Sequence, residues 1–591
     1  MLLHTNVFVY FTFVLAWLGL VAAHTACHDE TFIPDAILRV TEAPLAQSCY
    51  PSKPTVLVNG TSPGPALKIR EGDTYWIRVY NDMEHLNLTM HWHGLSMATS
   101  PFSDGTPLAS QWPIPPGKFF DYEIHVPTGM AGTYFYHSHV GFAAVSCTGP
   151  LIVQDVKKVP YKYDEERIVF LQDVFKKDDS TIEKGLISNP LSWSGESDMI
   201  LVNGKGAGTA NGTACNASLA AIDVKPGKTY RLRFIGATAL TFASLAIEGH
   251  DMTVIEADGS YTEPYNTSFL QIYTGQRYSV LLKTKPHPEK STYWMQIESR
   301  ERPTLTRSFA VLNYGVPSPP TIFYPPSQLP ITVPSITRGF LDYQLKPHHS
   351  NHHMAKMPSA ANVTRTIIMT VHQRVNGPTV WVQNSYPWTE TFPQEPYLVS
   401  LYKNNASNFP SMERALANNG IDPVTRVFPA QIGEVIEIII QNTGADRGGL
   451  DAHPFHAHGA HYWDLGSGNG TYDQAANEAR WAASAGKPIK RDTSVLYRYA
   501  PSTKNGTAMG WRAWRLEVTQ PGVWMIHCHI LQHMLMGMQT IWVMGNAKQV
   551  MKVDRLDVQG YLTYGGDVVG DENRWPSVVE FQSAANWTDG Q

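Results

Sequence analysis

The stretch His527-Cys528-His529, followed by His533 and Met538, carries the strongest structural signal in this chain. In an extended strand alternate side chains point to opposite faces, so Cys528 faces one way and its two histidine neighbours face the other. A metal bound by Cys528 and a metal bound by the flanking histidines would be separate centres joined through one residue of backbone on each side. Thiolate, imidazole and thioether donors together select copper for one-electron transfer. The stretch therefore predicts an electron-transfer relay built on a β-strand.

Strand patterns also dominate the rest of the chain. Short apolar and alternating segments, separated by clusters of Gly, Pro, Asn and Asp, occupy residues 55–58, 75–80, 230–234 and 435–440. Such spacing is typical of β-sandwiches and barrels, and the expected fold class is all-β. The best helical pattern, over residues 473–485, is expected to be an insertion in the last domain.

Three segments begin alike, each with a turn glycine followed by an alternating strand. They cover residues 71–79, 225–233 and 431–439. We interpret them as a threefold internal repeat, with convergent hairpin chemistry as the alternative. The length of 591 residues is too great for one core and suggests three or four domains.

Composition limits the classes of partner. Charged residues make up 16% of the chain and the net charge is -5, so nothing favours nucleic acid or an anionic membrane surface. Residues 1–23 run through an apolar stretch and end in Val21-Ala22-Ala23, the pattern of a signal peptide, with an uncleaved anchor as the alternative. No later apolar run is long enough to span a membrane. We expect a soluble, secreted, extracellular glycoprotein with sequons at Asn59, Asn87, Asn211, Asn216, Asn266, Asn362, Asn405, Asn469, Asn505 and Asn586.

The five cysteines fit an oxidising compartment. Two disulfides among Cys27, Cys49, Cys147 and Cys215 would leave Cys528 unpaired. A free thiol between two histidines is better explained as a metal ligand than as an unused residue.

Four histidine motifs appear in order along the chain. They are His91-Trp-His93, His137-Ser-His139, His453-Pro-Phe-His456-Ala-His458, and His527-Cys-His529 with His533. Each His-x-His pair on a strand places both imidazoles on one face, where they can bind a metal. A single pair is more often structural. Four pairs, two early and two late in the chain, suggest a multinuclear cluster clamped between the first and last domains.

On these four motifs the chain resembles the multicopper oxidases, the group of laccases, ascorbate oxidases and ferroxidases, over essentially its whole mature length. On the stretches 140–147 and 530–538 the chain looks most like the ascomycete laccase-like branch, which is related to the ascorbate oxidases. The resemblance implies three cupredoxin-like Greek-key β-barrel domains. The expected boundaries are a signal peptide at 1–23, domains at 24–158, 159–316 and 361–591 with a C-terminal tail, and a Pro- and His-rich linker at 317–360 running extended over the surface.

The resemblance also implies four copper ions. The type 1 copper would be held by His453, Cys528 and His533, with Met538 as axial ligand. The type 2 copper would take His91 and His458. One type 3 copper would take His93, His137 and His529, and the other His139, His456 and His527. Cys528 and His533 would carry electrons from the reductant, and Asp104 would be the acid beside the cluster, with an ordinary Asp-Gly turn as the alternative.

The activity implied is one-electron oxidation of phenols coupled to reduction of O2 to water, by a monomer. Ascorbate oxidase and ferroxidase are the enzymatic alternatives, and a copper-binding or storage protein is the non-enzymatic one. Two departures from the family stand out. Leu531 occupies a position where many relatives keep a carboxylate, and residues 237–243 contain no substrate-binding carboxylate. The axial Met538 favours a lower potential than Leu or Phe would.

Two further expectations concern packing and cross-links. Trp388, Tyr462 and Trp463 are either lining residues of the reductant pocket or ordinary core residues. Among the disulfide pairings, Cys49 with Cys215 and Cys27 with Cys147 are favoured.

Overall fold

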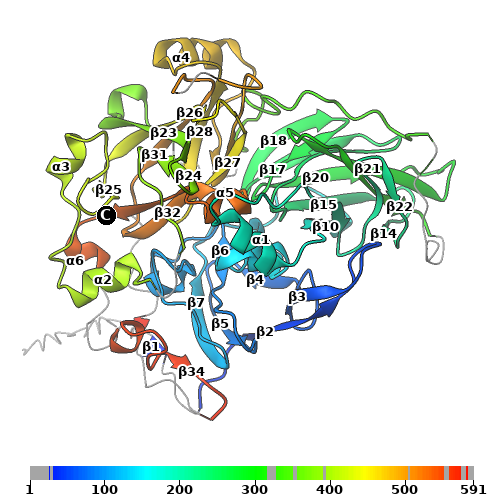
Figure 1. Ribbon diagram of the computed structural model, residues 1–591. Coiled ribbons are helices and arrows are strands. Elements are labelled where there is room, and N and C mark those ends of the chain that lie inside the picture. The colour runs from blue at the N-terminus through cyan, green and yellow to red at the C-terminus, as the bar shows by residue number, and fades with distance from the viewer. Residues whose placement is uncertain are drawn as a thin grey trace, which may run out of the picture.

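The structure, a computed structural model, contains three β domains, each built from two packed sheets (Figure 1). It describes residues 25–26, 31–315, 326, 328–349, 356–390, 394–503, 506–551, 558–573 and 581–582. The expected signal peptide, Cys27 and the sequons at Asn505 and Asn586 lie outside the described residues. The prediction of an all-β fold of three cupredoxin-like domains is confirmed.

The first domain pairs a five-stranded sheet, in the order β3-β2-β5-β7-β34, with a four-stranded sheet, β4-β9-β8-β6. Its strands are β2 (Ala36–Leu45), β3 (Lys53–Val58), β4 (Leu67–Arg70), β5 (Thr74–Asn81), β6 (His91–His93), β7 (Lys118–His125), β8 (Gly132–His137) and β9 (Thr148–Gln154). The strand β34 (Val569–Gly570) comes from the far end of the chain and pairs with β7.

The second domain has a six-stranded sheet, β11-β10-β15-β20-β17-β18, and a seven-stranded sheet, β13-β12-β22-β21-β16-β19 with β14 beside β22. The strands are β10 (Glu165–Val174), β11 (Met199–Val202), β12 (Ala207–Ala210), β13 (Thr213–Cys215), β14 (Ala220–Asp223), β15 (Thr229–Gly236), β16 (Phe242–Ile247), β17 (Met252–Ala257), β18 (Ser260–Thr267), β19 (Leu270–Ile272), β20 (Arg277–Lys283), β21 (Thr292–Arg300) and β22 (Thr306–Asn313).

The third domain has a six-stranded sheet, β24-β23-β26-β31-β28-β29, and a five-stranded sheet, β25-β33-β32-β27-β30. The strands are β23 (Arg365–Val375), β24 (Thr379–Gln383), β25 (Val427–Ala430), β26 (Val435–Ala445), β27 (His453–Ala457), β28 (Tyr462–Gly468), β29 (Lys490–Arg491), β30 (Thr493–Leu496), β31 (Trp511–Glu517), β32 (Gly522–Cys528) and β33 (Gln539–Met544). A further two-stranded pair joins β1 (Thr25–Ala26) to β35 (Phe581–Gln582).

The predicted threefold repeat is visible in the sheet topology. Strands β5, β15 and β26 each pair in parallel with the first strand of their domain and antiparallel with a later one. The turn glycines before them, Gly72, Gly227 and Gly433, have φ values of +85°, +69° and +91°. Only glycine adopts this left-handed conformation without steric cost, which explains its place in the repeat.

Helices are short and connect strands. The predicted helix is α4 (Gln474–Ala483), and the side chain of Asp473 caps it by accepting a hydrogen bond from Ala476 N at 2.8 Å. The other helices are α1 (Asp179–Leu186), α2 (Tyr397–Lys403), α3 (Met412–Leu416), α5 (Leu531–Leu535) and α6 (Ala547–Val550), with 3-10 turns η1 (Pro101–Asp104), η2 (Gly141–Val145), η3 (Ala360–Asn362) and η4 (Gln559–Tyr561).

The linker does not run over the surface throughout its described part. Leu341 and Leu345 are buried in the core of the second domain, and Asp342 pairs with the buried Arg512 of the third domain at 2.8 Å. Apolar side chains between the Pro-rich pieces hold this segment against both domains. In the histidine run, His348 is buried and His349 is exposed, while His352 and His353 lie outside the described residues.

One of the two expected disulfides is present. Cys49 and Cys215 are bonded, with their Cα atoms 5.5 Å apart, and they join the first domain to the second. Cys147 is buried and is not disulfide-bonded to any described residue, and its expected partner, Cys27, lies outside the described residues.

Candidate metal centre

The thiol site brings together residues from one sheet and the helix after it. His453 begins β27, Cys528 ends β32, and His533 lies in α5. The Nδ1 atoms of both histidines are 3.8 Å from Cys528 Sγ and 3.1 Å from each other. The backbone of Met538 lies beside these residues. Its carbonyl O accepts a hydrogen bond from Cys528 N at 3.1 Å, and its N donates one to His533 O at 3.0 Å. All four predicted residues are thus buried together.

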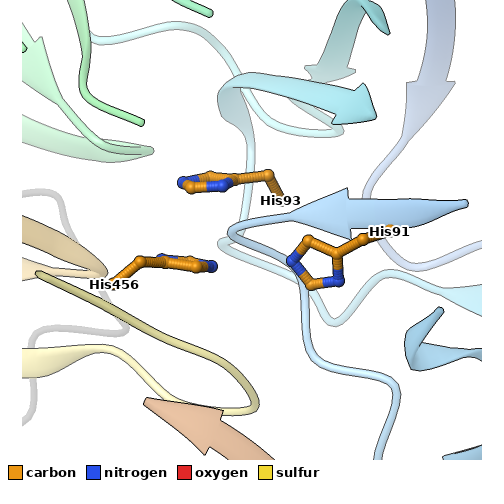
Figure 2. Close-up of side chains that lie close together, drawn as sticks. All are labelled: His91, His93 and His456. Carbon is orange, nitrogen blue, oxygen red and sulfur yellow. The ribbon is translucent and has the colours of Figure 1, made fainter. Parts of the chain in front are cut away.

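The eight remaining histidines converge between the first and third domains. They come from β6, the end of β8 and the segment after it, β27 and the residue that follows it, and β32 and the residue that follows it. The imidazoles of His93 and His456 stack with centroids 3.7 Å apart, and His91 lies beside them (Figure 2). Donor atoms lie within 4.8 Å of one another in the groups His93–His137–His529, His139–His458–His527 and His91–His93–His456.

This grouping differs from the expected one by an exchange of His456 and His458. His458 Nε2 lies 3.1 Å from His527 Nε2, so His458 groups with His527 and His139, whereas His456 groups with His91 and His93. His458 also groups with His91 and Asp104, but there its outer nitrogen, Nδ1, faces the Asp104 carboxyl. The two residues are separated by one position and share a face, so alternation along the strand cannot distinguish their partners. The crossing of the two domains decides it.

Hydrogen bonds fix which ring nitrogen faces the centre. The Nδ1–H groups of His91, His137, His456 and His527 donate to the backbone carbonyls of Asp104, Ser138, Asp492 and Cys528, at 2.7, 2.7, 3.0 and 3.0 Å. Among the described residues, Nε2 of His91, His137 and His456 has no hydrogen-bond partner. These lone pairs point into the cluster, and outer hydrogen bonds of this kind orient histidine ligands in metal sites.

Burial keeps the imidazoles unprotonated. It lowers the pKa of His137 and His453 to about 4 and that of His527 to about 3. It also lowers, well below the ordinary value, the pKa of His91, His93, His139, His458, His529 and His533. Neutral imidazoles with free lone pairs are the form that binds metals, so the donor set fits copper.

Asp104 lies beside the histidine cluster, next to a glycine turn. Its Oδ2 accepts a hydrogen bond from His458 Nδ1 at 3.0 Å, and Oδ1 is 3.6 Å from His91 Nδ1. Burial raises the pKa of this carboxyl. Gly105 has φ +78°, and a Cβ there would lie 2.0 Å from Met90 O. The Asp-Gly pair is therefore both a tight turn and a carboxyl directed at the cluster.

The surroundings of His533 contain residues that the sequence analysis missed. Asp451 Oδ2 lies 3.7 Å from His533 Nε2 and 3.0 Å from Arg302, which also pairs with Glu196 at 2.6 Å. Burial raises the pKa of Asp451, but Arg302 and the two nearby histidines outweigh it, so the pKa ends below its usual value. Trp193 lies over this group, with its ring 6.3 Å from that of His533. No local sequence pattern marks these residues, because they come from distant segments.

The aromatic candidates divide between two environments. Tyr462 is buried and stacks on Trp514 at 3.8 Å, and Trp463 is also buried, so both are core residues. Trp388 is half-buried, and its backbone N donates to Gly537 O, next to Met538, at 3.2 Å. The stretch 237–243 packs against α5, where Leu531 N donates to Ala239 O at 3.0 Å. It contributes no carboxylate to the thiol site.

Comparison with known proteins agrees with this geometry. Residues 39–158, 165–317 and 390–548 each match a multicopper oxidase sequence family. This chain belongs to the multicopper oxidase family. Members are oxidoreductases that use copper, a reductant and O2. The chain is 44% identical to laccase-like multicopper oxidase 1 of Thermothelomyces thermophilus, covering 96% of both proteins.

Other proteins similar to this multicopper oxidase are named for other activities. The chain is 33% identical to L-ascorbate oxidase of Nicotiana tabacum, covering 83% of this chain and 86% of that one. The crystal structure of Fet3p, a multicopper oxidase that functions in iron import, superposes with a TM-score of 0.66 at 24% identity. It covers 90% of this chain and 92% of that one, and the likeness concerns the fold alone. In the part of the chain that the structure describes, no helix has both the length and the apolar character needed to cross a membrane.

Proposed function

We propose that this multicopper oxidase couples one-electron oxidation of phenols to four-electron reduction of O2 to water. The observation that carries the proposal is the position of Cys528. Its sulfur faces His453 and His533, while its neighbours His527 and His529 face the histidine cluster. One residue of backbone on each side thus connects a one-electron site to a multinuclear site. A storage protein would not need this connection.

The donor groups support four copper ions. Copper would supply one-electron chemistry at the thiol site and oxygen chemistry at the histidine cluster. The proposed type 1 ligands are His453, Cys528, His533 and Met538. The proposed type 2 ligands are His91 and His456, and the type 3 ligands are His93, His137 and His529 for one ion and His139, His458 and His527 for the other.

Charge around His533 supports neutral reductants. Asp451 and Glu196 carry two negative charges and Arg302 carries one positive charge, so the group is net negative. A neutral phenol can approach such a site more readily than the ascorbate anion. The likeness to a laccase-like relative supports the same substrate class. Ascorbate oxidation is the second candidate, because relatives with that name are 31–33% identical.

The proposal extends to processing and assembly. We infer removal of residues 1–23, secretion and glycosylation, a monomer, and domains over residues 24–158, 159–316 and 361–591. The separate sheet pairs support the division into domains, and the disulfide supports secretion into an oxidising compartment.

Oxygen uptake by the copper-loaded protein tests the substrate class. A dimethoxyphenol, a catechol, ascorbate and Fe(II) should be compared at equal concentration. Preferential turnover of phenols is expected. Preference for ascorbate or Fe(II) would assign the protein to those activities, and no uptake with any reductant would favour a copper-binding protein.

The Cys528→Ser variant tests the electron path. It should lose the blue absorption band and at least 99% of turnover, because a hydroxyl does not replace a thiolate at a type 1 site. The fold, measured by circular dichroism, should be retained. Unchanged activity would contradict the role of Cys528.

A further inference from the structure

The turn between β19 and β20 of the second domain reaches the histidine cluster, although that domain contributes none of the eight histidines. Gly275 in this turn has φ +87°, and a Cβ there would lie 3.0 Å from His529 Cδ2 and 3.2 Å from His93 Cε1. Its N donates to Gly236 O at 2.8 Å. The backbone of the turn therefore packs directly on two imidazole rings from two other domains.

The neighbouring residue, Thr274, contacts the ring nitrogen of His529. Its Oγ1 lies 3.0 Å from His529 Nδ1. The same oxygen is also within hydrogen-bond distance of two carbonyl oxygens, Thr238 O and His529 O. A carbonyl can only accept, so the single hydroxyl hydrogen is directed to one of them. The oxygen must then accept the Nδ1–H of His529.

This contact determines the tautomer of His529. With the proton held on Nδ1, the lone pair is on Nε2, which lies 3.1 Å from His93 Nδ1 in the cluster. His91, His137, His456 and His527 instead donate to backbone carbonyls. His529 has its outer nitrogen held by a hydroxyl side chain of the second domain.

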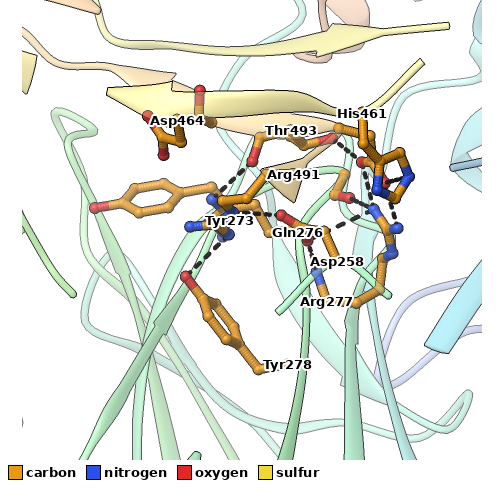
Figure 3. Close-up of polar contacts among 12 residues, drawn as sticks. Asp258, Tyr273, Gln276, Arg277, Tyr278, His461, Asp464, Arg491 and Thr493 are labelled. Atoms are coloured by element: carbon orange, nitrogen blue, oxygen red, sulfur yellow. Dashed lines mark hydrogen bonds and ion pairs between the residues drawn. The ribbon is translucent and has the colours of Figure 1, made fainter. Parts of the chain in front are cut away.

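Arg277, at the start of β20, holds the turn in place. Its guanidinium donates to Gly275 O at 2.9 Å, to Thr133 O of the first domain at 3.0 Å, and to Asp492 of the third domain at 2.7 Å. Asp258 accepts from Arg277 N at 2.7 Å and from Arg491 at 2.6 Å (Figure 3). These charged groups are buried and mutually paired. The turn is therefore fixed relative to both domains that form the cluster.

We propose that Thr274 is a positioning residue for the type 3 copper shared by His93, His137 and His529. Its hydroxyl holds His529 in the tautomer that presents Nε2 to the metal, so the second domain controls how tightly that copper is bound. The inference rests on the proposed assignment of His529 as a ligand. Loss of an outer hydrogen bond to a metal-binding histidine weakens metal affinity by roughly 10- to 100-fold.

The experiment compares Thr274→Val, which removes the hydroxyl at nearly constant shape, with Thr274→Ser, which keeps it. Thr148→Val is the matched control, because Thr148 is a buried threonine that lines a small cavity with His137 and His529 but donates its hydroxyl hydrogen to Tyr136 O at 2.8 Å. Each copper-loaded protein is dialysed against graded chelator. Bound copper is counted by mass spectrometry, and the type 1, type 2 and type 3 ions are distinguished by absorption and electron paramagnetic resonance.

Thr274→Val should lose type 3 copper at roughly 10- to 100-fold lower chelator concentration than the wild type, and its blue band should be retained. Thr274→Ser and Thr148→Val should behave as the wild type. Equal copper retention by Thr274→Val, or equal loss in Thr148→Val, would overturn the proposal. If the valine variant does not fold, Thr274→Ala removes the same hydroxyl with less volume. A wild type that binds no type 3 copper would instead refute the proposed function.

Discussion

At the scale of single residues, burial and hydrogen bonding arrange the donor groups of the site. Eleven of the twelve predicted ligands are histidine or cysteine, and all of these are buried or nearly so. Backbone carbonyls orient four of the imidazoles, and burial lowers the pKa of His137, His453 and His527 enough to keep them neutral. Asp104 is the carboxyl directed at the outer nitrogens of two of them.

Replacing Asp104 with Asn distinguishes between its two possible roles, an acid beside the cluster and an ordinary turn residue. Asn forms the same tight turn but cannot exchange a proton, so we expect O2-dependent turnover to fall on the order of 100-fold. The rate at which phenol bleaches the blue band should remain unchanged in stopped-flow measurements. An Asn variant with normal turnover would leave Asp104 as a turn residue only.

Glu123 is not one of the proposed copper ligands, and its buried carboxyl should make the stability of the protein depend on pH. Burial raises the pKa of this carboxyl to about 8, and among the described residues its Oε2 has no hydrogen-bond partner. Below about pH 4.5 the group is protonated in both folded and unfolded chains. As pH rises to 8, only the unfolded chain releases the proton, so the free energy of unfolding falls by on the order of 5 kcal/mol and stays lower above pH 8.

The Glu123→Gln variant should therefore melt at a higher temperature than the wild type at pH 8.5 and at the same temperature at pH 4.5. Glu84→Gln is the control, because the Glu84 side chain is 90% exposed. A melting-temperature difference for Glu123→Gln that does not change with pH would contradict the assigned pKa.

At the scale of elements, the short helix α5 connects the thiol site to the cluster. It carries His533 toward Cys528, and its first residue, Leu531, lines a small cavity with His137, His527 and His529. The cavity lining is largely apolar and contains no carboxyl group.

Introducing a carboxyl at position 531 tests whether proton supply to the cluster limits turnover. We expect Leu531→Glu to raise the O2 reduction rate several-fold at pH 7, because a carboxyl in the cavity can deliver protons. Leu531→Gln supplies similar shape without an acid and should show no increase. Equal rates in the two variants would mean that protons reach the cluster by another route.

At the scale of the whole molecule, distant segments join the domains. The Cys49–Cys215 bond links the first two domains across 166 positions, Arg277 contacts all three, and β34 returns the end of the chain to the first sheet. Because the site lies between domains, its geometry depends on these connections.

Removing the disulfide should destabilise the protein without changing the copper sites. The Cys49→Ser/Cys215→Ser variant is expected to lose roughly 2–5 kcal/mol of stability, mainly through a less constrained unfolded chain. Its melting temperature should fall by several degrees, while the blue band stays unchanged. A reducing agent should lower the melting temperature of the wild type but not that of the variant.

The sequence by itself determined the fold class, the threefold repeat, the helix at 474–483 and the identity of the donor residues. These features depend on local periods and turn residues, which the chain encodes over a few positions. Tertiary structure alone decided that His458 rather than His456 joins His139 and His527, that Asp451 lies beside His533, and that Thr274 contacts His529. Each of these contacts joins segments tens to hundreds of residues apart, and only the packing of the three domains brings them together.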